Sequence, residues 1–169
     1  MSELMTGRAV RVAALVLGLL LIAMANIGCG STPKMGRYDI VVTPDATMRD
    51  SSGSLALVEV DLVGVSELQE AEWLAYPVDT YFSGSDAMRR GAAEYTYRMT
   101  FGPNESGPKT LESSDPIWNI WKERGVTSMV IMGSSRQMRP AAGAPETRRK
   151  QIPLTTDRWK TEKIDVVVK

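Results

Sequence analysis

The sequence predicts a mainly β protein, a β-sandwich with two short helical insertions. Two stretches, Val58–Leu62 and Glu94–Phe101, alternate apolar and polar side chains, which is the pattern of a strand with one buried face. Strand-like segments do not alternate regularly with helices, which argues against a parallel α/β sheet. We therefore expect six or seven strands in two antiparallel sheets.

The remaining strands are predicted from shorter signals. The β-branched segment Tyr38–Thr43 ends at Pro44, and Val126–Met132 is apolar nearly throughout, as in a central strand. In chain order, strands are expected near residues 38–43, 58–62, 95–101, 126–132, 148–154 and 163–168. Residues 45–54 and 133–147, rich in turn-forming side chains, are expected to be loops. In the second strand we expect Glu59 and Asp61 to face solvent.

Helical insertions are predicted by their end signals. Ser66 and Gln69 form a capping-box pattern, and Pro77 stops the helix that follows. A second helix begins with Asp115 as its cap and ends before Gly125, and its apolar face should lie against a sheet. Residues 86–92 predict an additional short turn of helix.

The N-terminus has the layout of a secretory signal. Two arginines precede the uncharged stretch Val12–Gly28, which ends in a small residue immediately before the only cysteine, Cys29. We therefore expect residues 1–28 to be a signal peptide, residues 29–37 a tether and residues 38–169 a single sandwich domain. The alternatives are an uncleaved membrane anchor and a buried free thiol.

Composition limits the classes of function. Removal of residues 1–28 leaves 141 residues with 18 basic and 19 acidic side chains, and such a near-neutral domain has no general attraction for nucleic acid. With one cysteine no internal disulfide can form. Histidine is absent, which excludes Ser-His-Asp and Cys-His catalysis. We expect no cofactor, no metal site and no enzymatic activity.

The junction Gly28-Cys29 resembles the bacterial lipoprotein signal, in which the cysteine receives diacylglycerol before cleavage. The resemblance implies that Cys29 is the lipid attachment point and that the bilayer is a partner of the protein. In this family an aspartate after the cysteine retains the protein at the inner membrane, and here that residue is Gly30. The implied location is the outer membrane, facing the periplasm.

The order of features is also similar to the type VI secretion outer-membrane lipoprotein of the TssJ or SciN type. The resemblance is carried by Val41–Asp45, by the Ser-Gly loop and the strand from Leu55 to Val63, by aromatic residues in 72–82, and by Gly125 and Trp159. It implies a transthyretin-like or immunoglobulin-like sandwich with a helical insertion. It also implies a lipoprotein that anchors a secretion machine's inner-membrane component to the outer membrane.

Most side chains that could take part in catalysis or binding also have a simpler structural interpretation. Glu59 and Asp61 share one strand face, as paired carboxylates of a glycoside hydrolase would, but a solvated strand face is the commoner reason. Asp45 and Asp50 lack the spacing of a calcium loop. The four tryptophans are expected mainly in the core, with a carbohydrate or peptide platform as the alternative. They are Trp73, Trp118, Trp121 and Trp159.

The candidate partner site is a basic stretch in which Glu146 is the only acidic side chain. Guanidinium and ammonium groups on a loop suit an anionic envelope partner, a protein, a lipid headgroup or the cell wall, and the alternative is a merely solvated loop. The stretch consists of Arg136, Arg139, Arg148, Arg149 and Lys150.

Three functions remain open. The first is a membrane-anchored envelope lipoprotein that serves as a non-enzymatic binding or assembly module. The second is a type VI secretion lipoprotein that tethers the membrane complex. The third is an anchored hydrolase that uses aspartate or glutamate alone. A cleft with two facing carboxylates would favour the third.

Overall fold

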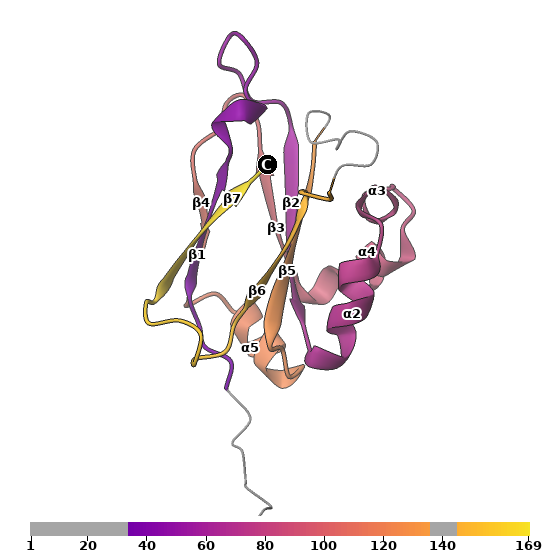
Figure 1. Ribbon diagram of the computed structural model, residues 1–169, viewed down its shortest axis with the longest axis vertical. Helices are drawn as coiled ribbons and strands as arrows, with labels where there is room; N and C mark the ends of the chain where they lie inside the picture. Colours follow the sequence, from indigo (N-terminus) through magenta and orange to yellow (C-terminus); the bar gives the residue numbers. More distant parts are fainter. Residues whose placement is uncertain (1–33, 136–144) are drawn as a thin grey trace, which may run out of the picture. The chain divides into compact units, whose positions relative to one another are not determined.

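The computed structural model describes residues 34–135 and 145–169, which form two stacked β-sheets (Figure 1). Seven strands lie within these ranges. They are β1 (Asp39–Pro44), β2 (Val58–Val65), β3 (Thr96–Phe101), β4 (Lys109–Leu111), β5 (Ser128–Ser134), β6 (Arg149–Pro153) and β7 (Lys163–Val168). The mainly β sandwich predicted from the sequence is therefore confirmed.

One sheet has three strands in the order β4-β1-β7, and the other has four in the order β3-β2-β5-β6. Neighbouring strands of the four-stranded sheet are antiparallel. In the three-stranded sheet β1 is antiparallel to β4 but parallel to β7, with Asp39 opposite Lys163. The expectation of two purely antiparallel sheets is wrong here, because the first and last strands of the chain enter the sheet from the same end.

The main core lies between the two sheets. Inward side chains alternate along the strands, as Ile40 and Val42 in β1 and Ile164 and Val166 in β7 do. The helix α5 (Ile117–Glu123) contributes to the same core with Ile117, Trp118 and Trp121. The Oδ1 atom of Asp115 accepts a hydrogen bond from the N–H of Ile117 at 2.9 Å, although Pro116, one residue later than the predicted cap, directly precedes the helix.

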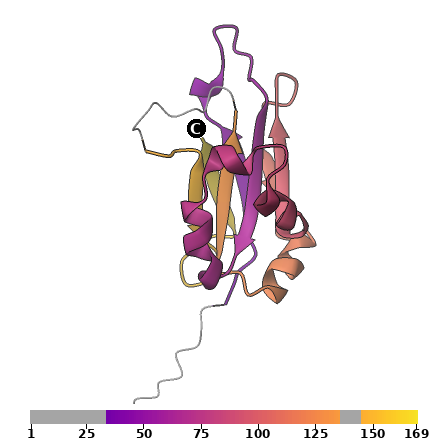
Figure 2. The same cartoon turned by 90° about the vertical axis from the view of Figure 1, so that its right-hand side faces the viewer.

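A second apolar cluster lies on the outer face of the four-stranded sheet. It is covered by α2 (Glu67–Ala75), α3 (Val78–Tyr81) and α4 (Ala87–Gly91), which belong to one insertion between β2 and β3 (Figure 2). The Gln69 Oε1 atom accepts a hydrogen bond from the N–H of Ser66 at 3.4 Å, so the predicted capping pattern begins α2. The buried members are Val63, Val65, Trp73, Val78, Tyr81, Ala92, Val130 and Met132.

This insertion changes the environment of β2. Asp61, expected on a solvent-facing side, is only 1% exposed, because the helices cover the face from which it projects. The solvent-face prediction is wrong for Asp61, whereas the side chain of Glu59 on the same face is 43% exposed. Two 3-10 turns, η1 (Ala46–Met48) and η2 (Ala93–Tyr95), complete the described elements.

The described part of the predicted tether is attached to the domain. The Gly36 N–H donates to the Leu154 carbonyl oxygen at 2.7 Å, and the Thr156 N–H donates to the Lys34 carbonyl oxygen at 2.9 Å. Met35 and Thr155 pair in an isolated antiparallel bridge. Within 34–135 and 145–169, every helix is too short or too polar to cross a membrane.

Candidate functional site

The predicted site residues differ in where they lie relative to the described elements. Cys29, Arg136 and Arg139 lie outside the described residues. Arg148 lies directly before β6, and Arg149 and Lys150 lie within it. These three consecutive residues lie at the β6 edge of the four-stranded sheet, but their side chains contact different elements, namely α3, the end of α2 and β7.

Arg148 is a buried, paired side chain. Its side chain is 5% exposed, and its guanidinium lies 2.7 Å from Asp79 Oδ1 and 2.7 Å from Glu146 Oε2. Hydrogen bonds to Glu146 and Asp79 raise the pKa of Arg148 above its usual value. Arg148 is therefore not a free charge on a loop, since Asp79 from α3 supplies a carboxylate that is distant in sequence.

Arg149 and Lys150 contact main-chain oxygens. A guanidinium N–H of Arg149 donates to the Tyr76 carbonyl oxygen at 2.6 Å, close to the end of α2. The Lys150 ammonium donates to the Val167 carbonyl oxygen at 2.5 Å, which links β6 to β7 of the other sheet. Both hydrogen bonds use backbone acceptors, although Arg149 also helps to lower the pKa of Glu146 and Lys150 that of Asp45.

A cavity of about 540 Å³ adjoins Arg148. Its lining residues come from the segment before β2, from α3 and from the end of β5. They are Ala56, Leu57, Glu59, Asp79, Ser134, Ser135 and Arg148. The cavity is mixed in charge, and Leu57 at its edge is 61% exposed.

Two carboxylates line this cavity, and each is paired with an arginine. Glu59 lies 3.1 Å from Arg89, and Asp79 lies 2.7 Å from Arg148. Among the described residues, no three His, Cys, Asp or Glu side chains are grouped so that they could hold a metal ion.

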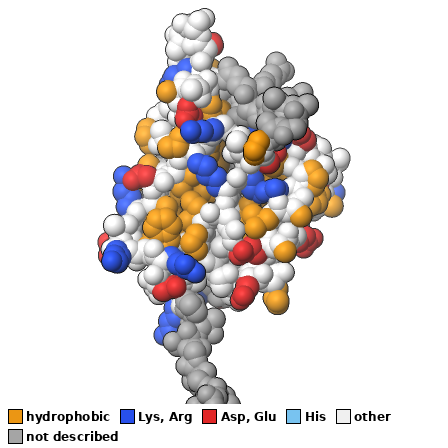
Figure 3. All heavy atoms as spheres, in the orientation of Figure 1, with side chains coloured by type: hydrophobic (Ala, Val, Ile, Leu, Met, Phe, Trp, Pro, Cys, Tyr) orange, Lys and Arg blue, Asp and Glu red, His pale blue; other side chains and the backbone are white. Residues whose placement is uncertain are grey.

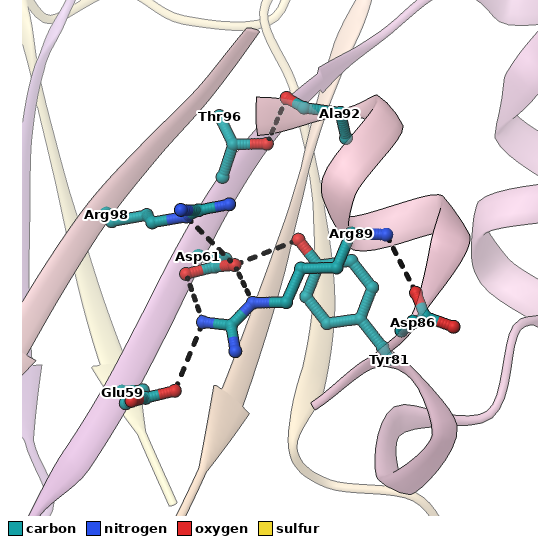
Figure 4. A network of polar contacts seen from close by, with 8 residues as sticks. All are labelled: Glu59, Asp61, Tyr81, Asp86, Arg89, Ala92, Thr96 and Arg98. Carbon is teal, nitrogen blue, oxygen red and sulfur yellow. Dashed lines mark hydrogen bonds and ion pairs between the residues drawn. The ribbon is translucent and has the colours of Figure 1, made fainter. Parts of the chain in front are cut away.

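A polar network surrounds Asp61, which the sequence indicated only as one of two solvent-facing carboxylates on a strand. Its Oδ2 atom accepts hydrogen bonds from the Tyr81 hydroxyl at 2.9 Å and from Arg89 Nε at 3.0 Å (Figure 4). Arg98 of β3 reaches the same carboxylate at 3.7 Å, a distance of ion pairing without a hydrogen bond. Burial and the charge of Asp61 raise the pKa of the Tyr81 hydroxyl.

Aromatic rings and a carboxylate both contact the guanidinium of Arg89. Its carbon atom lies 4.5 Å from the centroid of the Phe82 ring and 5.6 Å from that of Tyr81. Its Nη2 atom donates a hydrogen bond to Glu59 at 3.1 Å. These contacts fix α4 against β2. This network is thus a clamp between the insertion and the sheet, and its partners converge only in the folded chain.

Three of the four tryptophans are core residues, as expected. Trp73, Trp118 and Trp121 are at most 2% exposed. The Trp118 and Trp121 rings pack edge to face with centroids 4.9 Å apart. Trp159, in the β6–β7 connection, is only partly buried against the core.

Comparison with solved structures finds proteins of type VI secretion. The chain is similar to the T6SS lipoprotein TssJ1 from Pseudomonas aeruginosa, with 14% identity, a TM-score of 0.49 and coverage of 80% of this chain and 90% of that chain. It is similar to Lip of Serratia marcescens, described as a membrane bound component of the Type VI Secretion System, with 12% identity, a TM-score of 0.48 and coverage of 79% and 89%.

A third similar structure is a type VI membrane complex, with 12% identity, a TM-score of 0.49 and coverage of 79% of this chain and 94% of that chain. The chain is thus distantly similar to the type VI secretion lipoproteins. No protein-family model matches it, and no curated protein matches it.

Proposed function

We propose that this chain is a lipid-anchored, non-enzymatic binding or assembly module of the bacterial cell envelope, acylated on Cys29. One observation carries the proposal. The uncharged stretch Val12–Gly28 ends at the sole thiol, and Lys34, the first described residue, is already hydrogen-bonded to the sandwich. A lipid-anchored protein needs an apolar leader segment, a cysteine at its end and a folded domain that begins soon afterwards, and the chain has this arrangement.

The proposed location is the outer membrane, facing the periplasm. The residue after Cys29 is glycine rather than the aspartate that implies retention at the inner membrane. Two or more acyl chains hold a protein durably, whereas one chain binds only marginally. The sandwich is then available to contact proteins of the periplasm while it remains attached.

The proposed partner-binding group comprises Arg136, Arg139, Arg149 and Lys150, while Arg148 supports it from within. Arg149 and Lys150 donate their hydrogen bonds to backbone oxygens rather than to carboxylates among the described residues, which favours contact with an anionic partner. Arg148, in contrast, holds Glu146 and α3 in place. Its replacement would disturb the fold as well as any contact with a partner.

The more specific form of the proposal is a tether for the membrane complex of a type VI secretion system. The sequence resemblance over residues 38–168 implies this role, and the helical insertion after the second strand agrees with the family's architecture. The implied partner is the inner-membrane component of the machine. A generic envelope module would instead capture other proteins.

The test is purification of the tethered protein from solubilised envelopes, with mass spectrometry of its N-terminus and of its companions. We expect a chain that begins at an acylated Cys29. Recovery of an inner-membrane secretion component supports the specific form, and recovery of other envelope proteins alone supports only the general one. A full-length chain with a free thiol contradicts both.

The partner group is tested by the double variant Arg136→Ser/Arg139→Ser and separately by Arg149→Ser/Lys150→Ser, with Arg148 unchanged. We expect weaker crosslinking to the captured partner in both variants. Arg90→Ser, which removes an exposed charge from α4, is the matched control. Unchanged capture in both double variants would remove this group from the proposal.

A further inference from the structure

The chain enters the folded domain at one defined end. Lys34, Met35 and Gly36 are bonded to residues 154–156, which lie between β6 and β7. We name residues 34–37 and 154–163 the tether end. It lies at the end of the sandwich where β1 and β7 begin (Figure 1).

Very little chain separates this end from the proposed lipid anchor. Only residues 30–33 lie between Cys29 and Lys34. A fully extended chain spans about 3.3–3.6 Å per residue, so this segment reaches at most about 18 Å. This step rests on the proposed acylation of Cys29, which would keep the tether end close to the bilayer surface.

The tether end carries an excess of positive charge. Five basic side chains stand against Asp157 and Glu162 within it, while Asp39 and Asp165 lie beside Lys163, Asp165 at 3.0 Å. Arg158 remains 67% exposed although it lies 3.6 Å from Asp157. The basic side chains are Lys34, Arg37, Arg158, Lys160 and Lys163.

Trp159 lies between two of these basic residues. Its indole N–H donates to the Pro153 carbonyl oxygen at 2.6 Å, which fixes the ring at the edge of the core while part of it stays exposed. Apolar, basic and acidic side chains lie next to one another on the lower half of the face shown in Figure 3. Tryptophan flanked by lysine and arginine is favoured at the headgroup level of a bilayer.

We propose that the tether end is a membrane-docking surface that lies on anionic phospholipid headgroups, with Trp159 in the interfacial layer. Acyl chains alone would leave the domain free to rotate about the tether. Basic side chains within one Debye length of the bilayer bias that rotation, because each gains from the negative surface potential. The elements at the opposite end of the sandwich then face away from the membrane.

The experiment uses the mature protein purified from membranes, with its intact mass recorded first. It is reconstituted into vesicles of phosphatidylglycerol and brominated phosphatidylcholine, and into vesicles of brominated phosphatidylcholine alone. The measurement is quenching of tryptophan fluorescence by the bromine atoms. Because Trp73, Trp118 and Trp121 are buried, contact quenching reports on Trp159.

We expect quenching in the anionic vesicles, little in the neutral ones, and its loss in Trp159→Phe. The double variant Arg158→Gln/Lys160→Gln should lower the ratio of docked to undocked protein about tenfold or more, since two favourable charges are removed. The control Arg49→Gln/Arg90→Gln removes the same charge elsewhere on the domain and should quench as the unaltered protein does.

The possible failures are distinguishable. A mass that shows an unmodified Cys29 contradicts the proposed function and the reach argument with it. An acylated protein with no quenching, or with equal quenching in Trp159→Phe, overturns only the docking surface. The wavelength of Trp159 fluorescence emission could also shift with soluble polyglutamate but not with anionic vesicles. That result would mean that this end binds an acidic protein, and it would overturn the proposal.

Discussion

The Oδ2 atom of Asp61 lies 3.0 Å from Nε of Arg89, although 28 residues separate them and the carboxylate is almost fully buried. Asp61 belongs to β2 and Arg89 to α4. Their ion pair fastens the helical insertion to the outer face of the four-stranded sheet. A buried carboxylate is tolerated there because Tyr81, Arg89 and Arg98 surround it.

Asp61→Ala should lower the free energy of unfolding by about 3 kcal/mol, because Arg89 and the Tyr81 hydroxyl would lose their buried acceptor. Urea unfolding followed by circular dichroism measures the change. Arg98→Gln is the matched control, since Arg98 is 48% exposed and lies 3.7 Å from the carboxylate, and it should cost less than about 1 kcal/mol. Equal costs for the two variants would contradict the assignment of the clamp to Asp61 and Arg89.

Gly64→Ala should destabilise the sandwich by about 1–3 kcal/mol through overpacking. A Cβ atom at position 64 would lie 2.6 Å from the Trp121 ring, which is fully buried and cannot retreat. The measurement is the shift in thermal midpoint. In Gly91→Ala the added Cβ meets no atom within 4 Å, so this control should lose no stability. A stable Gly64→Ala variant would show that Trp121 can move.

The stability of the domain should depend on Glu146 in acid. Hydrogen bonds from Arg148 hold the pKa of Glu146 below its ordinary value of about 4.3. The folded state therefore binds this proton less readily than the unfolded state. The contribution of Glu146 is fully present above its ordinary pKa and is lost as pH falls through the lower folded pKa.

Urea unfolding at a series of pH values tests this dependence. The difference in unfolding free energy between the unaltered protein and Glu146→Gln should be largest near neutral pH and should shrink as the pH falls below about 4. Subtracting the unfolding free energies of the two proteins at each pH cancels the contribution of the other carboxylates, which both proteins share. A difference that stays constant with pH would mean that Arg148 does not favour the charged form of Glu146.

Asp115→Ala should cost about 1 kcal/mol, the usual cost of losing a side chain that caps a helix. Asp115 accepts the N–H of Ile117 at the start of α5, and α5 contributes Trp118 and Trp121 to the core. Ser114→Ala provides the control one residue earlier. Chemical denaturation of both variants gives the comparison, and equal stabilities would show that Asp115 does not cap the helix.

The strands with clear alternation were predictable from the sequence, since Val58–Leu62 lies within β2 and Glu94–Phe101 contains β3. Residues 163–168 form β7 as expected, and the expected strand at 148–154 appears as β6 (Arg149–Pro153). The three-residue strand β4 (Lys109–Leu111) was missed, because it is too short to show a period and follows Pro108. The parallel pairing of β1 with β7 was missed as well, since contacts between the two ends of a chain leave no local pattern.

The candidate site was less predictable than the fold. Glu59 and Asp61 occupy equivalent positions in the alternating pattern, yet only Asp61 is buried, because α3 and α4 cover that part of β2. The partners of Arg148 show the same difficulty. Glu146 is two residues from Arg148 and could be recognised in the sequence as a nearby acidic side chain. Asp79 lies 69 residues earlier and could not be recognised as a partner.

The parallel pairing of β1 with β7 also sets an order of assembly. β1 is the middle strand of its sheet, and β7, one of its two neighbours, comes last in sequence among the described strands. Until the chain has been synthesised as far as Val168, β1 has only the short β4 beside it. Folding of the three-stranded layer must therefore await residues 163–168, and removal of β7 would leave β1 without most of its hydrogen-bonding partners.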